Sequence, residues 1–482
     1  LTRRFSTSTT YFYSITAIIP QIVGIGQGLY ILCIFVSTAL GFNERAFDLG
    51  VAMVSGFQLS IILVGTVMVV YSVIGGLWAA VLSDTVQAII ITVMTVLIFP
   101  SSYSYLGEGH GIFAGFTRLL NEAPKGYFSL SGDTANPLFL LAYFVNVMLG
   151  YNVGWALVQR YYSVADERDT KKMAILCAVL SVVGPILWIL PVMASRVIFP
   201  DMKALWPSFA VPAEASFVSL ALMLLPHGLI GFVVSAILSA TLGQANDSFN
   251  WLAATITRDM YVPLRKRWFN TEASDKSQLR VARSTMFIVG GLGIWVAFYI
   301  PKFGGAFQFA LQFYSLTAAF MMPVFLGILY TRTPWWSGIA SCSAAIGVAL
   351  TLMALGIWQD QAFVRNMLSE SIAATAVFFG SAFWFKADDP RHAELLRFEK
   401  DLRLPAYGDS AHLAPSGFKA YALIGKICLI IGVVLVACVF TPSTQLAPAS
   451  LNIVAGALCL LLGASILYLT RDRSRPQEGS GQ

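Results

Sequence analysis

Residues 239–250 read Ser-Ala-Thr-Leu-Gly-Gln-Ala-Asn-Asp-Ser-Phe-Asn, and this stretch decides the fold. It continues an apolar stretch, 228–238, that is hydrophobic enough to enter a bilayer as a helix. At about 100° per residue, one sector of that helix holds Ser239, Gly243, Asn246, Asp247 and Asn250. A polar stripe at this depth is costly in hydrocarbon, so it must face other helices or a water-filled cavity. The stripe predicts the wall of a solute or ion site, or else a buried helix whose polar groups bond only to neighbouring helices.

The composition of the chain is that of a membrane protein. Apolar residues make up 57% of the 482 residues, charged residues make up 12%, and the mean hydropathy is +0.71. The charged residues cluster between long apolar stretches, each of which can cross about 30 Å of hydrocarbon as a helix. We expect an all-α polytopic membrane protein whose twelve spans are 13–40, 51–75, 84–102, 137–158, 173–198, 227–256, 281–300, 307–330, 336–357, 367–385, 420–440 and 451–470.

Lysine and arginine are distributed unevenly among the connections between these spans. If residues 1–12 are cytoplasmic, most of the 31 basic residues fall on that same side of the membrane, above all in 258–283 and 386–419. Cytoplasmic loops of multi-pass proteins carry such an excess. We therefore expect an integral protein of the bacterial inner (plasma) membrane, with both ends of this chain in the cytoplasm. The net charge of +6 then reflects topology rather than nucleic-acid binding.

The sequence indicates no enzyme and no cofactor other than a possible sodium ion. The six cysteines lie inside spans without a metal-ligand spacing, and the four histidines are scattered. No Gly-x4-Gly-Lys-[Ser/Thr] motif for a nucleotide phosphate occurs. The chain begins with Leu1 rather than Met, which indicates a fragment or a processed chain that lacks an N-terminal portion.

Shorter signals predict local structure. Gly24, Gly26 and Gly28 permit close helix packing in the first span. Residues 103–135 are expected to form an outer loop, 214–225 a helix on the outer rim, and 388–404 a short amphipathic helix.

Residues 71–87 read Tyr-Ser-Val-Ile-Gly-Gly-Leu-Trp-Ala-Ala-Val-Leu-Ser-Asp-Thr-Val-Gln and link the second and third expected spans. Gly75 and Gly76 predict a helix break. Asp84 would either cap the following helix or serve as a cation way-station on the cytoplasmic side.

This stretch resembles the signature of the sodium:solute symporter family, which usually reads Gly-Gly-x-x-Ala-Val-x-Thr-Asp-x-x-Gln. Three later stretches resemble the family in the same order. Residues 159–172 look like its Gln-Arg loop, 235–261 like its eighth core helix and 306–333 like its tenth.

The resemblance implies a five-plus-five inverted-repeat transporter core, with the solute at mid-membrane beside broken helices. Span 13–40 would be the third core helix. The first two core helices are then absent, although the first supplies part of both the solute site and the sodium site in this family. Residues 1–335 would hold the third to tenth core helices, and 336–470 additional C-terminal helices with a cytoplasmic loop at 386–419. Residues 471–482 would be a cytoplasmic tail.

Span 137–158 would be the sixth core helix, the counterpart of the missing first one. Its glycines, Gly150 and Gly154, favour local unwinding, which is tolerated at this depth only beside a cavity. The side chains that we expect to contact the solute are Asn146, Tyr151, Asn152, Trp155 and Gln312. A packing seam of glycines and aromatic rings is the alternative.

For the ion we expect contacts from Asp84, Ser239, Gln244, Asp247 and Ser248. The hydroxyl pair that family members carry on the eighth core helix aligns with Gly243 and Gln244, so this chain departs from the family there. A lone carboxylate in a membrane helix is either paired, protonated or holding a cation. Asp247 lies one turn from Gly243 and is therefore expected to take over coupling, by binding sodium or by carrying a proton.

The sequence thus favours a secondary transporter that couples symport of a small polar organic solute to a monovalent cation, sodium or a proton. Its partners would be the solute, the cation and membrane lipids, and not nucleic acid. Members of the family that the chain resembles carry sugars, amino acids, carboxylates and vitamins, and the amide-rich site does not choose among them. The alternative is a symporter-like sensor or regulatory module without coupled transport, which the departure at Gly243 would suit.

Overall fold

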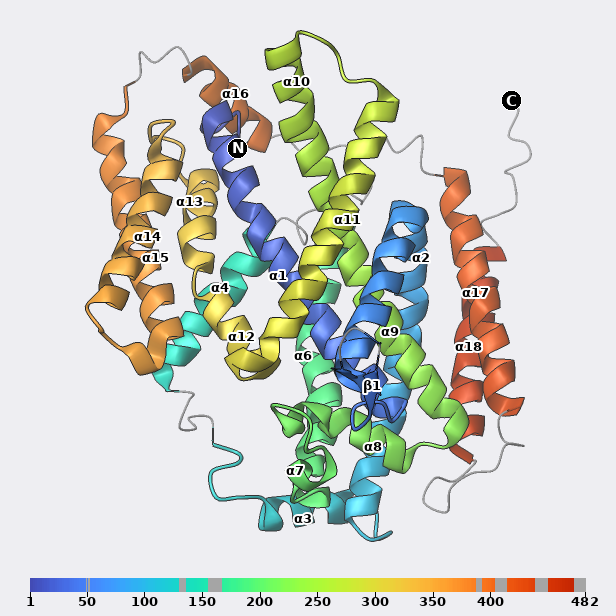
Figure 1. Cartoon of the computed structure of the whole chain (residues 1–482). Helices are drawn as coiled ribbons and strands as arrows, with labels where there is room; N and C mark the ends of the chain where they lie inside the picture. The colour runs from blue at the N-terminus through green and yellow to red at the C-terminus, as the bar shows by residue number, and fades with distance from the viewer. Residues whose placement is uncertain are drawn as a thin grey trace, which may run out of the picture.

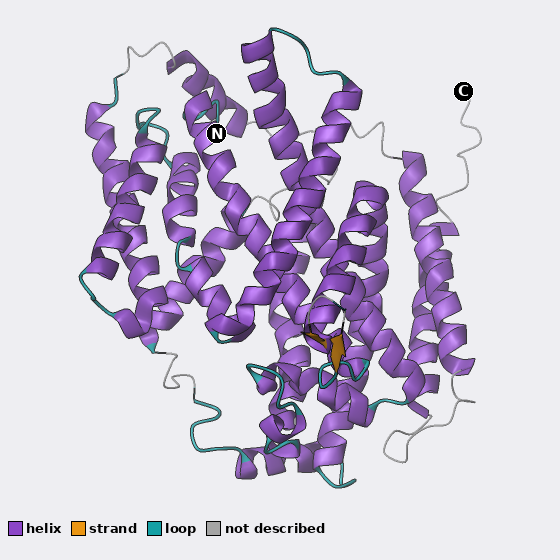
Figure 2. Cartoon of the chain, viewed as in Figure 1, coloured by secondary structure: helices purple, strands orange, loops and turns teal. Residues whose placement is uncertain are grey.

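Helices make up nearly all of the fold, and a short β-hairpin is added to them (Figures 1 and 2). The computed structural model describes residues 1–48, 50, 53–129, 136–154, 167–386, 392–403, 414–437 and 450–471. The elements are α1 (Thr7–Ala39), β1 (Ala46–Asp48), β2 (Met53–Ser55), α2 (Gly56–Leu106), α3 (Ile112–Glu122), α4 (Pro137–Val153), α6 (Glu167–Ile198), α7 (Met202–Leu205), η2 (Pro212–Ala215), α8 (Ser216–Leu224), α9 (His227–Ala254), η3 (Thr255–Tyr261), α10 (Val262–Phe269), α11 (Asp275–Tyr299), η4 (Ile300–Phe303), α12 (Gly305–Tyr314), α13 (Thr317–Leu329), α14 (Ser337–Ala354), η5 (Gln359–Gln361), α15 (Ala362–Gly380), η6 (Ser381–Trp384), α16 (His392–Arg403), α17 (Ala414–Ala437) and α18 (Ser450–Arg471). The strands β1 and β2 pair antiparallel.

The described helices confirm a multi-pass membrane protein. Eight of them are long and apolar enough to span a bilayer, and these eight coincide with eight of the twelve expected spans. A ninth expected span, 307–330, is the bent pair α12 and α13, whose axes differ by 49°. The other three expected spans fall on α4, α17 and α18, whose described apolar parts are shorter.

Helix α2 covers the second and third expected spans in one element. A reciprocal capping box between Ser55 and Gln58 starts it, and its backbone then stays helical through Gly75, Gly76 and Asp84. The element nevertheless contains two candidate spans, Gly56–Ile74 and Val86–Leu106, which are the second and third expected spans. The side chain of Asp84 lies outside the described part of the chain, so its predicted cap stays a prediction. In Figure 1, α2 begins beside β1 and ends beside α3, both at the lower side, so the chain reverses direction within this element.

Connections that were expected to share a side of the membrane lie at the same end of the helix bundle. In Figure 1 the N terminus, α10 and α16 lie at the top, whereas the hairpin, α3 and α7 lie at the bottom. A contact confirms the first grouping, because the Arg3 guanidinium donates to the Asp401 carboxylate of α16 at 3.0 Å.

The core of the bundle is the packing of α1, α2, α9 and α11. Glycine permits the close approach of these helices. A Cβ at Gly26 of α1 would lie 2.6 Å from Val296 Cγ1 of α11, and one at Gly293 would lie 2.7 Å from Ile25 Cγ2. The expected packing role of Gly26 is therefore confirmed.

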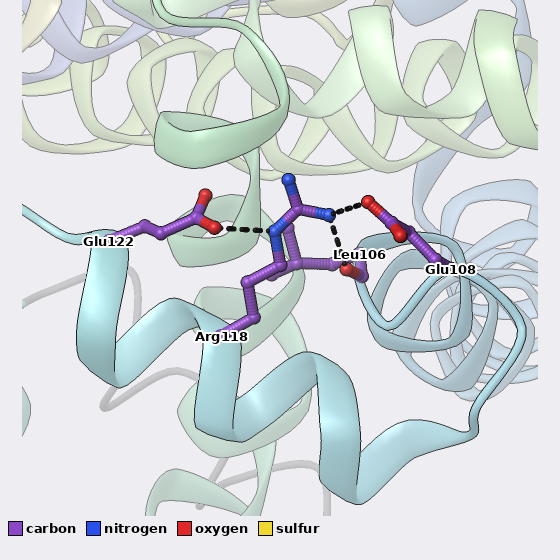
Figure 3. Close-up of polar contacts among 4 residues, drawn as sticks. All are labelled: Leu106, Glu108, Arg118 and Glu122. Carbon is purple, nitrogen blue, oxygen red and sulfur yellow. Dashed lines mark hydrogen bonds and ion pairs between the residues drawn. The ribbon is translucent and has the colours of Figure 1, made fainter.

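Short helices cover the lower side. The expected rim helix is present there as α8, whereas the expected amphipathic helix is present as α16 at the opposite, upper end (Figure 1). The interpretation of 103–135 as a loop is wrong, because α3 forms there and buries Gly115 and Leu119 against the end of α2. Arg118 fixes α3 in place: its guanidinium donates to Glu108 and Glu122, each at 2.7 Å, and to the carbonyl of Leu106 at 3.1 Å (Figure 3).

Candidate functional site

A cavity of about 770 Å³, which we call the central cavity, lies among the helices of the bundle. Its walls come from α1, α2, α4, α6, α9, α12 and α13. Most of the lining is apolar, and the polar side chains are Tyr13, Thr16, Gln21, Gln87, Thr92, Thr95, Gln244, Asp247, Ser248 and Tyr314. Few polar groups in a mainly apolar cavity are typical of a site that binds a small organic molecule.

The polar wall of this cavity is α9, which carries the sequence discussed first. Gln244, Asp247 and Ser248 line the cavity. Asn246 is instead fully buried in the packing, where its amide oxygen accepts a hydrogen bond from Asn250 Nδ2 at 3.2 Å. The polar face that was expected to line a site therefore does so only in part. Asn246 and Asn250 bond to each other within the helix, whereas Asp247, next to Asn246 in the sequence, lines the cavity.

A second, much smaller cavity adjoins the first. Its volume is about 10 Å³, which is about the minimum needed for a single water molecule. It lies between α1 and α9 and shares Gly24, Gln244 and Ser248 with the large cavity. Thr241 and Gly28 also line it, and a Cβ at Gly28 would lie 3.4 Å from Thr241 Cγ2. Thr241 and Ser248 thus bring two hydroxyl-bearing residues of α9 to the lining of this small cavity.

Helix α4 is continuous through Gly150, so the predicted unwinding at that residue is wrong. Asn136 caps its N-terminus by accepting from the Phe139 N–H at 2.8 Å, and Pro137 follows in the first turn. Nothing lies within 4 Å of a Cβ built at Gly150, so no neighbouring group there forces the backbone out of the helix. The helix ends instead at Gly154, which lines the cavity together with Val153.

Four of the five side chains expected to contact the solute lie outside the lining of this cavity. Tyr151 is 55% exposed, and Asn152 is exposed and donates to its own helix at the Met148 carbonyl, 2.7 Å away. Asn146 and Gln312 also lie outside the lining, although Tyr314, two residues after Gln312, belongs to it.

Three further expected site residues cannot be placed by their side chains. Trp155 lies outside the described residues. Asp84 lies within α2, one turn before the cavity-lining Gln87, and Ser239 lies within α9, but the side chains of both lie outside the described part of the chain.

Sequence reasoning missed the polar lining from other helices. Gln21 of α1 and Thr92 and Thr95 of α2 sit singly in apolar spans, where nothing in the local pattern distinguishes a cavity-lining residue from a packed one. Gln87 was detectable, because it ends the motif at 71–87.

Known proteins are similar to this chain in sequence and in fold. A sodium/glucose cotransporter of Vibrio parahaemolyticus is 24% identical over 365 residues, covering 70% of this chain and 66% of that protein. The sodium/sialic acid symporter NanT of Aliivibrio fischeri is 23% identical, covering 60% of this chain and 58% of its own length. The chain thus spans less than two thirds of the length of these relatives.

A solved structure of a Na⁺-coupled sialic acid symporter, in a substrate-bound outward-open state, has the same fold. The TM-score is 0.62 at 20% identity, with 80% of this chain and 76% of that chain covered. The relatives are transporters and not enzymes. The model of the sodium:solute symporter family matches residues 20–340, and the chain therefore belongs to that family.

Proposed function

We propose that this chain forms the wall of a sodium-coupled symporter that carries a small polar organic solute through the central cavity. The observation that carries the proposal is the position of Gln244, Asp247 and Ser248, which face a cavity of about 770 Å³ inside an apolar bundle. Polar and charged side chains at this depth are costly unless they serve a ligand or one another. A volume of this size suits a small organic molecule.

The proposed sodium position is the wall between the two cavities. Sodium is a hard cation, for which oxygen atoms are the suitable ligands. Thr241, Gln244 and Ser248, each of which carries a side-chain oxygen, line the small cavity, and Asp247 lines the large one. A proton carried by Asp247 is the alternative coupling ion.

The proposed solute is rich in hydroxyl groups, like the sugar and the sugar acid that the names of the relatives contain. Gln21, Gln87 and Tyr314 offer hydrogen-bonding groups from three helices, and Trp188 of α6 offers an aromatic face. The family resemblance assigns a further share of the site to the first core helix, so the proposal concerns the wall that residues 1–482 supply.

The distribution of lysine and arginine supports a bacterial inner membrane with both ends of this chain in the cytoplasm. The side of the bundle that carries the N terminus, α10 and α16 would then face the cytoplasm.

The test is uptake of [¹⁴C]glucose and [¹⁴C]N-acetylneuraminate into proteoliposomes, with the sodium and proton gradients imposed independently. We expect uptake that requires the sodium gradient, and we expect Asp247→Asn to abolish that requirement or the uptake itself. Asn250→Ser is the matched control, because Asn250 lies one turn away on α9 and outside the cavity.

Each outcome separates the candidates. Dependence on the proton gradient alone would replace sodium by a proton. Uptake and ²²Na⁺ binding that are both absent in the wild type would favour the sensor alternative. Sodium dependence that persists in Asp247→Asn would leave Asp247 as a structural residue and restrict the ion site to Thr241, Gln244 and Ser248.

A further inference from the structure

The bent pair α12 and α13 shapes the central cavity on both sides of its break. Tyr314, the last residue of α12, lines the cavity, and so do Phe320, Met321 and Val324 of α13. Only Ser315 and Leu316 separate the two helices, whose axes differ by 49°. Any change in this angle would move one set of lining residues relative to the other.

Neither helix of the pair has a capping side chain of its own at its N-terminus. The N-cap residues are Gly304 for α12 and Leu316 for α13, and neither makes a side-chain cap. The first N–H groups of a helix have no partner within the helix and need an acceptor. Two glutamates from other elements accept from these groups.

Glu214 and Glu370 are these acceptors. Glu214 Oε1, on the rim segment η2, accepts from the Ala306 N–H of α12 at 2.7 Å. Glu370 Oε2, on α15, accepts from the Ala319 N–H of α13 at 3.0 Å. A carboxylate at a helix N-terminus also complements the helix dipole.

The C-terminal ends are held as well. Ser315 ends α12, and its Oγ accepts from Asn366 Nδ2 of α15 at 3.3 Å. The guanidinium of Arg4 donates to the carbonyls of Gly327 and Tyr330 at the end of α13, at 2.9 and 3.0 Å. All four ends of the broken span are thus bonded by side chains of other elements.

The two contacts at the bend differ from those at the outer ends in that both come from one helix. Asn366 and Glu370 are one turn apart on α15 and hold the two sides of the break. Glu370 is fully buried, and its second oxygen has no hydrogen-bond partner among the described residues. Burying a carboxyl group with so few bonds is costly. Because the bond that Glu370 does make is to the first turn of α13, we connect this cost with holding the bend in place.

We propose that Glu370 and Asn366 are positioning residues that fix the bend between α12 and α13 and thereby the shape of the central cavity. Neither side chain lines the cavity. The consequence for transport rests on the proposed function, but the bend itself does not, and the experiment below measures the bend.

The experiment is a double electron–electron resonance measurement on the purified chain with all native cysteines replaced by alanine. One spin-label pair joins the broken span to α15, at Phe307→Cys and Ile372→Cys. A control pair joins α2 to α11, at Val67→Cys and Ile288→Cys. All four labelled positions are exposed.

We expect a narrow distance distribution between α12 and α15 in the wild type. Glu370→Gln should keep it, since the amide oxygen can still accept from Ala319. Glu370→Leu removes this hydrogen bond, and we expect it to raise the share of displaced conformers about tenfold. A tenfold change in this equilibrium corresponds to about 1.4 kcal/mol, the size of one hydrogen bond. The control pair should stay unchanged in both variants.

The inference is overturned if Glu370→Leu leaves the α12–α15 distribution narrow, or if the control pair broadens equally, since the residue would then serve general stability. Should Glu370→Leu not fold, Asn366→Leu tests the other contact, and an unchanged distribution would refute the proposal. Normal distances in a wild type that shows no solute uptake and binds no ²²Na⁺ would count against the proposed function and leave the bend unaffected.

Discussion

Two adjacent glycines of α11 provide a matched test of the packing that holds the bundle together. A Cβ at Gly290 would overlap Val69 Cγ2 of α2, whereas a Cβ at Gly291 meets nothing within 4 Å. Both residues lie in the interior of the same helix. We therefore expect Gly290→Ala to destabilise the protein and Gly291→Ala to stabilise it.

The magnitude follows from two effects. Alanine is favoured over glycine in a helix interior by about 1 kcal/mol, and this gain is common to both variants. Overpacking a well-packed contact costs about 1–3 kcal/mol and applies to Gly290→Ala alone. The free energy of unfolding should therefore differ between the two variants by about 1–3 kcal/mol. Val69 cannot escape cheaply, because a β-branched side chain in a helix has one strongly preferred rotamer.

The assay is thermal and denaturant unfolding in detergent micelles, followed by tryptophan fluorescence. Val69→Ala in the Gly290→Ala background should recover most of the loss, and the double-mutant cycle isolates the contact. Equal stabilities for Gly290→Ala and Gly291→Ala would show that α11 and α2 do not approach as closely as described. Absence of any recovery with Val69→Ala would place the strain elsewhere.

Three further predictions concern the cavity and the two ends of the bundle. Gly24→Leu should lower ²²Na⁺ binding at least about tenfold with little loss of stability, because Gly24 lines both cavities and a Cβ there meets nothing within 4 Å. Arg4→Ala should lower the melting temperature by several degrees, because each buried carbonyl left without a donor costs about 1–3 kcal/mol, whereas Arg3→Ala breaks only an exposed ion pair worth about 0–1 kcal/mol. Burial raises the pKa of Glu214 above 4.5, so the wild type should lose stability relative to Glu214→Gln as the pH rises from 4.5 through the raised pKa, measured as the difference in melting temperature.

The membrane spans could be predicted because hydrophobicity alone determines them. A stretch such as 281–300 is apolar enough to cross the bilayer whatever its neighbours are, and α11 forms a helix of sufficient length there. The prediction of a break from glycine failed at Gly150, where α4 continues as a helix to Val153. Glycine weakens a helix by an amount that tertiary contacts readily exceed, so it indicates where a break is possible and not where one occurs.

The face of α9 that lines the cavity could be predicted only in part. Helical periodicity fixes the angles between side chains but not the direction in which neighbouring helices lie. Asn246 and Asn250 satisfy each other one turn apart, so their sector can be buried. Gln244 and Ser248 were expected as site residues and lie in the lining together with Asp247, but the hydroxyl of Thr241 was not singled out.

The bend at Ser315 and Leu316 had no local signal at all. Neither residue is glycine or proline, and the apolar stretch 307–330 reads as one continuous span. The acceptors that stabilise the two helix starts lie 92 residues before Ala306 and 51 residues after Ala319, on η2 and α15. The break is therefore specified by long-range contacts and not by the residues at the break. Because α15 follows the matched residues 20–340, the proposed contacts make a cavity wall within the matched region depend on a helix outside it. Substitutions at Asn366 and Glu370 of α15 should then change the cavity although neither residue lines it.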